Sequence, residues 1–282
     1  MTVPFEKWHG TGNDFLVVDA EACVPHRRAF AKAHCDRETG VSHPDTGRVG
    51  ADGVLFLALE RDCRPPRVVM TLVQPDGSTA PMCGNGARIA AAWAAERTNT
   101  DRIMLDTQAG TREATIDNRH VTIEMGYPSF EPAGVPLDRE TPLLEAQLCD
   151  LTVTAVNTGV PHAVAFVPDV SAVDLNTVAP PIRNHDVFPK GANVTLASQR
   201  AGGFAQRTYE RGVEGETRSC GTGAVAIGAV AHRLGLIDGA VTVSPPGGDL
   251  TVDVPMDGPA TLRGAVECSF TGELSHPEPM RS

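Results

Sequence analysis

The sequence has little that would suit a nucleic-acid-binding or a membrane protein. Its 282 residues carry 24 basic against 35 acidic side chains, a net charge of −11, and only three of the basic side chains are lysine. Proteins that bind the phosphate backbone of nucleic acids usually carry more basic than acidic residues, so we expect no nucleic-acid partner. No apolar run reaches the roughly 18 residues of a membrane span, and the first residues lack the basic and apolar segments of a secretory signal. These absences predict a cytoplasmic protein with no membrane partner.

The cysteines also lack the patterns of a disulfide framework or a structural zinc site. They are seven in number, widely scattered, and none forms a Cys-x-x-Cys pair. An odd, scattered set argues against both kinds of framework, and we expect no metal. A lone free cysteine is by default a buried, unreactive thiol. Cys83 and Cys220 need a different interpretation because of the residues that surround them.

Strand-like runs dominate the chain, and only two segments are convincing helices. The helices are predicted over Gly86–Arg97 and Gly223–Leu234, which are alanine-rich and apolar on nearly every side of their first turns. A helix without a polar face belongs inside a protein, here within sheet, and Gly235 is a fitting end for the second. The predicted strands are Phe15–Asp19, Val54–Leu59, Val68–Val73, Ile103–Asp106, Val121–Met125, Leu151–Val156, Ala163–Val167, Val194–Ala197, Val241–Ser244, Leu250–Val254 and Ala265–Phe270.

The segment that precedes each helix is repeated. An acidic turn, at Asp76 or Glu214, is followed by a Cys-Gly-x-Gly-Ala sequence that begins at Cys83 or Cys220. The two copies lie about half the chain apart. We interpret this as an internal duplication into two α/β halves, with the proline-rich segment Tyr127–Pro142 as the linker between them.

A cysteine at the start of a helix is a candidate acid/base. Unpaired N–H groups and a partial positive charge at a helix N-terminus lower the pKa of a thiol, and the same groups can hold a carboxylate. Two such sites predict a symmetric cleft, with a substrate carboxylate held by both helix ends and one sulfur on each face of the neighbouring carbon. That arrangement suits inversion of an amino acid without a cofactor: one thiolate takes the Cα proton and the opposite thiol returns one.

With these two motifs, the chain resembles a known family, the diaminopimelate epimerases. The likeness covers nearly the whole chain, and the two cysteine motifs, in order and at the family's separation, are its most specific part. The matching segments are His9–Phe15, Gly50–Gly53, Asp76–Ser78, Met82–Arg88, Glu210–Thr217, Pro246–Gly248 and Gly264–Leu274.

The resemblance implies an α+β fold of two pseudo-symmetric domains, each a barrel-like sheet around a central apolar helix. The implied domains are residues 1–130, joined by a C-terminal strand at about 268–282, and residues 131–267. The implied reaction converts LL-2,6-diaminopimelate, a small amino acid, to its meso isomer in lysine biosynthesis, with no cofactor. The sequence leaves open whether the protein forms a homodimer.

The resemblance also assigns roles to residues. Cys83 and Cys220 would be the catalytic acid/base pair. Asp14 and His162, with Glu210, would tune the thiols. The substrate-binding residues would be Asn13, Gly84, Asn85, Asn193, Glu210, Arg211, Gly221 and Thr222, together with Gln74 and Asn157 at the substrate's distal end.

Two positions depart from the family pattern at the substrate's distal end. The family usually has asparagine where this chain has Gln74 and Val160. Gln74 can replace asparagine with a longer reach, whereas Val160 has no hydrogen-bonding side chain, and Asn157 is a candidate for the missing amide. Extra sequence at Ser42–Arg48 predicts a surface loop.

Two alternatives therefore stay open. One is a cofactor-independent racemase of another amino acid, favoured by Gln74 and Val160. The other is a non-catalytic nucleotide-binding protein, because Gly221–Ala226 fits a Gly-x-Gly-x-x-Ala fingerprint, although no strand leads directly into it. At single positions, His162 could simply satisfy a turn, and Glu210 and Arg211 could form an ordinary surface ion pair.

Overall fold

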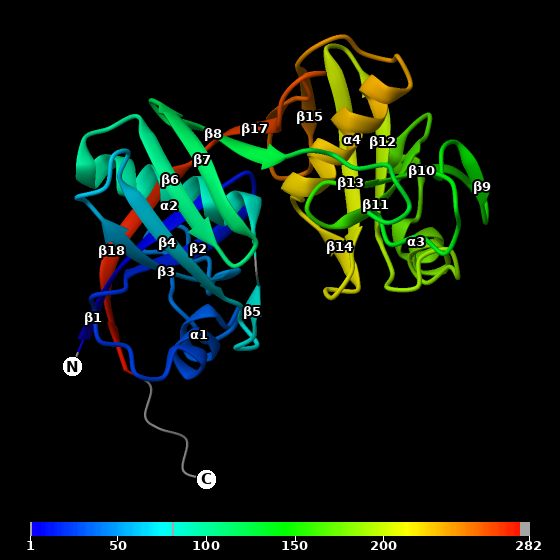
Figure 1. The fold of residues 1–282 in the computed structure, drawn as a ribbon. Coiled ribbons are helices and arrows are strands. Elements are labelled where there is room, and N and C mark those ends of the chain that lie inside the picture. Colours follow the sequence, from blue (N-terminus) through cyan, green and yellow to red (C-terminus); the bar gives the residue numbers. More distant parts are fainter. Residues whose placement is uncertain (1, 81, 277–282) are drawn as a thin grey trace. The chain divides into compact units, whose positions relative to one another are not determined.

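The computed structural model describes residues 2–80 and 82–276, and the chain divides into two compact units. Unit 1 comprises Met1–Ile123 and Gly264–Ser282, and unit 2 comprises Glu124–Arg263 (Figure 1). The part of the expected C-terminal strand at residues 277–282 lies outside the described residues.

Unit 1 is a mixed sheet whose strands pair in the order β18, β1, β2, β3, β4, β6, β7, β8. The pairs β2–β3 and β4–β6 are parallel and the other neighbours are antiparallel, with β18 against β1 at one edge. The short strand β5 also pairs with β4. The strands are β1 (Thr2–Gly10), β2 (Asn13–Asp19), β3 (Gly53–Glu60), β4 (Arg67–Val73), β5 (Thr79–Ala80), β6 (Arg102–Thr107), β7 (Gly110–Asp117), β8 (His120–Gly126) and β18 (Glu267–Ser275).

The helix α2 (Gly84–Thr98) is the core of unit 1. Every residue from Gly84 to Ala95 is buried, and the helix packs against β1, β3, β4, β6 and β7 (Figure 1). Its small alanine side chains let these strands approach from several sides, which explains why the sequence carries no polar face there. A second helix, α1 (Arg27–Cys35), buries Phe30 and Ala31 against β3 and β4.

Unit 2 repeats this plan around α4 (Gly221–Arg233). The strands β10, β11, β12, β13, β15 and β16 pair in that order, with β11–β12 and β13–β15 parallel and the others antiparallel. The helix α4 packs against all six. The elements are β9 (Ala146–Leu148), β10 (Leu151–Asn157), β11 (Pro161–Phe166), α3 (Leu175–Arg183), β12 (Asn193–Arg200), β13 (Gly203–Glu210), β14 (Gly215–Thr217), β15 (Val241–Ser244), β16 (Leu250–Asp253) and β17 (Ala260–Ala265), with a 3-10 turn at Val170–Ala172.

The succession of elements confirms the predicted α+β class and the duplication. In each unit an antiparallel pair is followed by a helix, α1 or α3, and then by a strand that joins the sheet in parallel. A short antiparallel strand, β5 or β14, then precedes the central helix, after which the chain re-enters the sheet in parallel. The two halves are thus pseudo-symmetric, each with an apolar helix at its centre.

Some sequence-based boundaries were wrong. Both central helices begin two residues earlier than predicted, at Gly84 and Gly221, so that each cysteine is itself the N-cap. The predicted strand Ala265–Phe270 is divided between the end of β17 and the start of β18. The helices α1 and α3 escaped notice because both are short, and α3 contains Pro180 and Pro181. Gly235, with φ of +69°, follows α4 as expected.

The segment Tyr127–Pro142 is not a linker between the units. It is irregular, as predicted, but it lies within unit 2, where Val135 and the adjoining Leu143 are buried in the hydrophobic core. Its prolines mark a loop that covers the core rather than an exposed hinge. Among the described residues, none of the helices combines the length and the hydropathy needed to cross a bilayer.

Candidate active site

Cys83 caps the N-terminus of α2 in unit 1. Its backbone is extended, with φ of −145° and ψ of 118°, and its Sγ accepts a hydrogen bond from the backbone N–H of Gly86 at 3.5 Å. The thiol is partly buried, and Gly84 next to it is buried. The sulfur therefore lies where the unpaired N–H groups and the positive end of a buried helix meet.

Asn85 connects this helix end to the strand β2. Its Nδ2 donates to Oδ1 of Asn13, and its Oδ1 accepts from Thr11 Oγ1 at 3.3 Å. Asn13 Nδ2 in turn donates to the carboxylate of Asp52 at 3.0 Å. The predicted residues Asn13, Gly84 and Asn85 are thus brought together around the capping turn of Cys83.

Asp14 belongs to a neighbouring charge cluster. Its carboxylate is buried and accepts from Lys7 at 2.7 Å, Arg37 at 2.7 Å and Arg48 at 3.1 Å. Burial alone would raise the pKa of Asp14, but hydrogen bonds from Arg37 and Lys7 hold that pKa at about 2. The cluster includes Arg48 because the extra loop folds back through a bridge between Ser42 and Val49. These contacts indicate that Asp14 stabilises the strand that carries Asn13.

Cys220 caps α4 in unit 2 and is the more buried of the two cysteines, with 6% of its surface exposed. Its Sγ lies 3.4 Å from Oγ1 of Thr222 and within hydrogen-bonding reach of the Glu210 carboxylate. Glu210 also accepts from Thr217 Oγ1 at 2.5 Å. A Cβ at position 223 would lie 2.7 Å from Nε2 of Gln206, so a larger residue there would displace the side chain that donates to the Cys220 carbonyl. The structure therefore brings Glu210, Gly221 and Thr222 together at Cys220.

The expectation of a lowered pKa is wrong for Cys220. Burial, and then the negative charge of Glu210, raise the pKa of this thiol well above its usual value, and the hydrogen bond from Thr222 only partly opposes them. Burial likewise raises the pKa of Glu210. At Cys220, desolvation and the nearby carboxylate therefore outweigh the effect of the helix dipole, and neither can be read from the local sequence.

His162 and Asn193 lie behind Thr222. His162 is fully buried, with Nε2 3.0 Å from Thr222 Oγ1 and Nδ1 2.9 Å from Thr195 Oγ1. Burial, and secondly the charge of Arg211, lower the pKa of His162 to about 3, so the ring is neutral at physiological pH. Asn193 Nδ2 lies 3.4 Å from His162 Nε2, and its Oδ1 accepts from the backbone N–H of Arg211.

Arg211 and Glu210 do not form the ordinary ion pair that was one interpretation of their sequence. The Arg211 guanidinium donates to the carbonyls of Lys190 at 2.8 Å and Gly191 at 3.2 Å. Glu210 faces Thr217 and Cys220 instead. The two neighbours therefore serve different parts of the site.

The residues predicted for the distal end of the substrate occupy turns. Gln74 Oε1 accepts from Ser78 Oγ at 2.7 Å in the turn after β4. Asn157 Nδ2 donates to the Gly134 carbonyl and its Oδ1 accepts from Gly159 N–H, so each amide atom keeps one further hydrogen-bonding position. Val160 is half-buried, and its backbone carbonyl accepts a hydrogen bond from Thr158 N–H.

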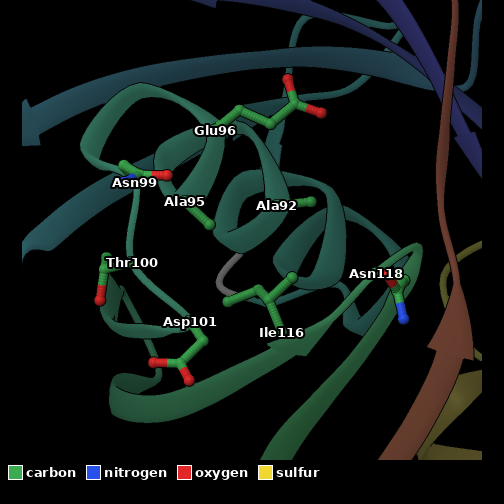
Figure 2. A pocket seen from close by; sticks show the side chains of 8 residues that line it. All are labelled: Ala92, Ala95, Glu96, Asn99, Thr100, Asp101, Ile116 and Asn118. Carbon is green, nitrogen blue, oxygen red and sulfur yellow. The ribbon is translucent and has the colours of Figure 1, made fainter.

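A separate surface pocket in unit 1 is not part of this site. It has a volume of about 580 Å³ and opens at the far end of α2 from Cys83 (Figure 2). Its lining residues are Ala92, Ala95, Glu96, Asn99, Thr100, Asp101, Ile116 and Asn118. In the described part of the chain, no three His, Cys, Asp or Glu side chains cluster in a way that could hold a metal ion.

Sequence reasoning missed several residues that the structure places at these two helix ends. In unit 1, Thr11 and Arg88 donate to the Asn85 amide oxygen, and Asp52 accepts from Asn13; in unit 2, Gln206 donates to the Cys220 carbonyl at 3.0 Å. Only Arg88 carried a usable signal, because it is a charge inside a helix that was predicted to be buried on nearly all sides. The others depend on which strands become neighbours.

The glycines of the proposed nucleotide fingerprint are helical. Gly221 and Gly223 are the first and third residues of α4, and β14 before them is a three-residue antiparallel strand. A phosphate-binding fingerprint needs these glycines in a loop directly after a parallel strand. The arrangement does not favour nucleotide binding.

Comparison with known proteins shows the family to which the chain belongs. The sequence model of a family described as diaminopimelate epimerase matches residues 5–131 and 154–268. The chain belongs to the diaminopimelate epimerase family. It is 43% identical over 282 residues to a diaminopimelate epimerase of Methanocella arvoryzae, an alignment that covers 96% of each protein.

Solved structures with low sequence identity share the fold. A phenazine biosynthesis protein of the PhzF family from Enterococcus faecalis matches with a TM-score of 0.65 at 16% identity, covering 98% of this chain and 100% of that protein. A hydroxyproline epimerase from Agrobacterium vitis matches with a TM-score of 0.64 at 17% identity, covering 97% and 91%. The two-unit architecture therefore recurs well beyond this family.

Proposed function

We propose that this protein is an isomerase that interconverts LL-2,6-diaminopimelate and meso-2,6-diaminopimelate without a cofactor, as a step of lysine biosynthesis. The observation that carries the proposal is the presence, in each of two pseudo-symmetric units, of a cysteine that N-caps a buried central helix. Membership of the diaminopimelate epimerase family supplies the substrate. Each half of the chain contributes one sulfur.

Cys83 and Cys220 are the proposed acid/base pair. In one direction the Cys83 thiolate takes the Cα proton, the electron pair of the C–H bond passes onto the substrate α-carboxylate, and the Cys220 thiol gives its proton to the opposite face. The new C–H bond forms on the face opposite the one that was broken, so the configuration of Cα is inverted. Cys83 is then protonated and Cys220 is the thiolate. The reverse reaction exchanges these roles.

The helix N-termini are proposed to hold the reacting carboxylate. The N–H groups that follow Gly84 and Gly221 lie at the positive ends of α2 and α4. Such donors stabilise the charge that develops on the carboxylate when the weakly acidic Cα proton leaves, which is the largest barrier in this chemistry. Asn13, Asn85, Asn193 and Thr222 would add hydrogen bonds to the substrate's amine and carboxylate.

Glu210 and His162 are proposed to support Cys220 rather than to exchange protons with substrate carbon. The Glu210 carboxylate contacts the thiol, and His162 reaches it only through Thr222. The Arg211 guanidinium is the proposed partner of the distal carboxylate. It would need to add this contact to those with Lys190 and Gly191.

A racemase of another amino acid remains the second candidate, because Val160 offers no side-chain hydrogen bond at the distal end and Gln74 is engaged with Ser78. A stereochemical assay across diaminopimelate, lysine, histidine and proline separates the two. Inversion of diaminopimelate with a kcat/KM far above the others supports the proposal. A preference for another amino acid would show that the proposed substrate is wrong, and the proposed two-base reaction would still stand.

Single cysteine variants test the acid/base pair. Cys83→Ala and Cys220→Ala should each lower epimerisation by at least about 100-fold, since a positioned acid or base contributes roughly 10²–10⁴ in rate. Cys149→Ala, an exposed cysteine, is the matched control and should keep wild-type turnover. Near wild-type turnover in either of the first two variants would refute the pairing.

We also infer a cytoplasmic location. The proposed reaction needs Cys83 and Cys220 as a thiolate and a thiol rather than in oxidised form. Thiols remain reduced in the cytoplasm and are readily oxidised outside it.

A further inference from the structure

Arg88 is a charged side chain in an unusual place. It lies in the second turn of α2 and is 0% exposed, in the middle of an alanine-rich buried helix. Within the described residues it forms no ion pair with a carboxylate, whereas Arg97 on the same helix pairs with Glu6. A buried charge without a partner of opposite sign is strongly unfavourable. We therefore expect an anion near Arg88 that compensates its charge.

The side chain of Arg88 points back to the helix end that Cys83 caps. Its Nη1 lies 3.5 Å from the Gly84 carbonyl, and its Nη2 donates to Asn85 Oδ1 at 2.5 Å and to Thr11 Oγ1. Its buried Nε has no hydrogen-bond partner. Side chains on an α-helix lean toward its N-terminus, which explains how a residue five positions after Cys83 reaches the first turn. The guanidinium therefore adds a full positive charge to the partial charge of the helix end.

Unit 2 has the opposite arrangement. The residue five positions after Cys220 is Val225, which is buried and carries no charge. The charged group that acts on Cys220 is the carboxylate of Glu210. One cysteine thus has a buried cation at its helix end, and the other has a partly buried carboxylate beside it.

We propose that Arg88 is a positioning residue whose buried guanidinium is the counter-charge of the Cys83 thiolate, so that in the resting enzyme Cys83 is deprotonated and Cys220 keeps its proton. This deepens the proposed function and rests on it for its catalytic meaning. The resting enzyme is then ready to accept a proton at Cys83 and to donate one from Cys220.

In the described part of unit 1, the carboxylates of Asp14, Asp52, Glu6, Asp106 and Glu113 are engaged by other cations. Asp52 reaches this region only through Asn13 and is paired with Arg37. Asp14 is paired with Lys7 and with two arginines. On the other elements that pack against α2, Glu6 of β1 pairs with Arg97 near the far end of the helix, Asp106 of β6 pairs with Arg67 of β4, and Glu113 of β7 pairs with Arg102 of β6.

The titration of Arg88 agrees with this placement. Burial lowers the pKa of Arg88 to about 10, and the anion of Cys83 acts in the opposite direction. The guanidinium is therefore still charged at neutral pH, although it is fully desolvated. A charge in such surroundings acts on a nearby thiolate more strongly than it would in water.

The test is the pH dependence of cysteine alkylation in the full chain, followed peptide by peptide with iodoacetamide and mass spectrometry. In the wild type, Cys83 should titrate below the value of about 8.5 for a free thiol, and below Cys220. Arg88→Met should raise the Cys83 midpoint by about one unit, which is a tenfold slower alkylation at neutral pH. Arg88→Lys should keep the midpoint near wild type because it keeps the charge, and Cys220 should not change in either variant.

Arg97→Met is the matched control, since it removes a charge from the same helix about 13 Å further along. It should leave the Cys83 midpoint in place. An unchanged Cys83 midpoint in folded Arg88→Met, or a wild-type midpoint at or above 8.5 if that variant does not fold, overturns the proposal. Epimerisation is measured separately: inversion by the wild type with no effect of Arg88→Met on the midpoint defeats this inference alone, and a shifted midpoint without inversion of any amino acid defeats only the proposed function.

Discussion

His162 Nε2 lies 3.0 Å from Thr222 Oγ1, and the same hydroxyl lies 3.4 Å from the sulfur of Cys220. A buried imidazole is thereby connected to the thiol through one hydroxyl. Because burial lowers the pKa of His162 to about 3, the ring is a neutral hydrogen-bonding group and not a charged acid. Its role in this account is to orient Thr222, and through it the thiol.

The lowered pKa of His162 should make the protein sensitive to mild acid. Its folded pKa of about 3 lies below its usual 6.5, so between these values the unfolded state binds more protons and stability falls as pH falls. Between pH 7 and pH 5 the wild type should therefore lose roughly 2 kcal/mol more free energy of unfolding than His162→Gln. Urea unfolding of both proteins at the two pH values measures this, and equal losses would show that His162 is not buried as a neutral ring.

Glu210 should hold the proton on Cys220. Its negative charge is, after burial, the largest cause of the raised pKa of that thiol, so Glu210→Gln should lower the alkylation midpoint of Cys220 by roughly one unit. Glu216→Gln is a suitable control, because Glu216 is exposed and pairs with Arg207 on the same sheet. A Cys220 midpoint that stays constant or rises in Glu210→Gln would show that the carboxylate does not raise the pKa of this thiol.

Asp14 should be needed for stability more than for chemistry. Asp14→Asn leaves the buried Lys7 without its carboxylate and should cost about 3–5 kcal/mol of folding free energy, whereas loss of the exposed partner in Arg48→Met should cost less than about 1 kcal/mol. The pKa of Asp14 is held at about 2 against a usual 3.8, so its contribution is complete above pH 4 and is lost as pH falls toward 2. Chemical unfolding at pH 7 and pH 3 measures both effects, and similar losses in the two variants would contradict the buried cluster.

The positions of Cys83 and Cys220 could be predicted from the sequence because the local signals agree. Alanine-rich helices without a polar face must be buried, and the glycines after each cysteine mark where those helices begin. The repeat of this unit predicted the two-fold plan, which the order of the strands confirms. These features could be predicted because each depends on a short, continuous stretch of the sequence.

The surroundings of the thiols could not be predicted in the same way. The pKa of Cys220 depends on Glu210, at the end of β13, and on desolvation, which comes partly from strands that are distant in the sequence, such as β10 and β11. The irregular segment Tyr127–Pro142 has the composition of a linker, but Val135 packs into the core of unit 2. Arg88 was a visible charge in a helix predicted to be buried, but its contacts with Asn85 and Thr11 could not be foreseen.

The most direct test of the central claim is the fate of solvent deuterium in the first few per cent of the reaction. LL-2,6-diaminopimelate is incubated with the enzyme in D₂O, and substrate and product are separated and analysed by mass spectrometry. If two different cysteines act on opposite faces of one carbon, deuterium appears in the meso product at the inverted carbon while the recovered LL substrate stays unlabelled. Deuterium in the recovered substrate at the rate of product formation would show that a single base removes and returns the proton, and would contradict the pairing of Cys83 with Cys220.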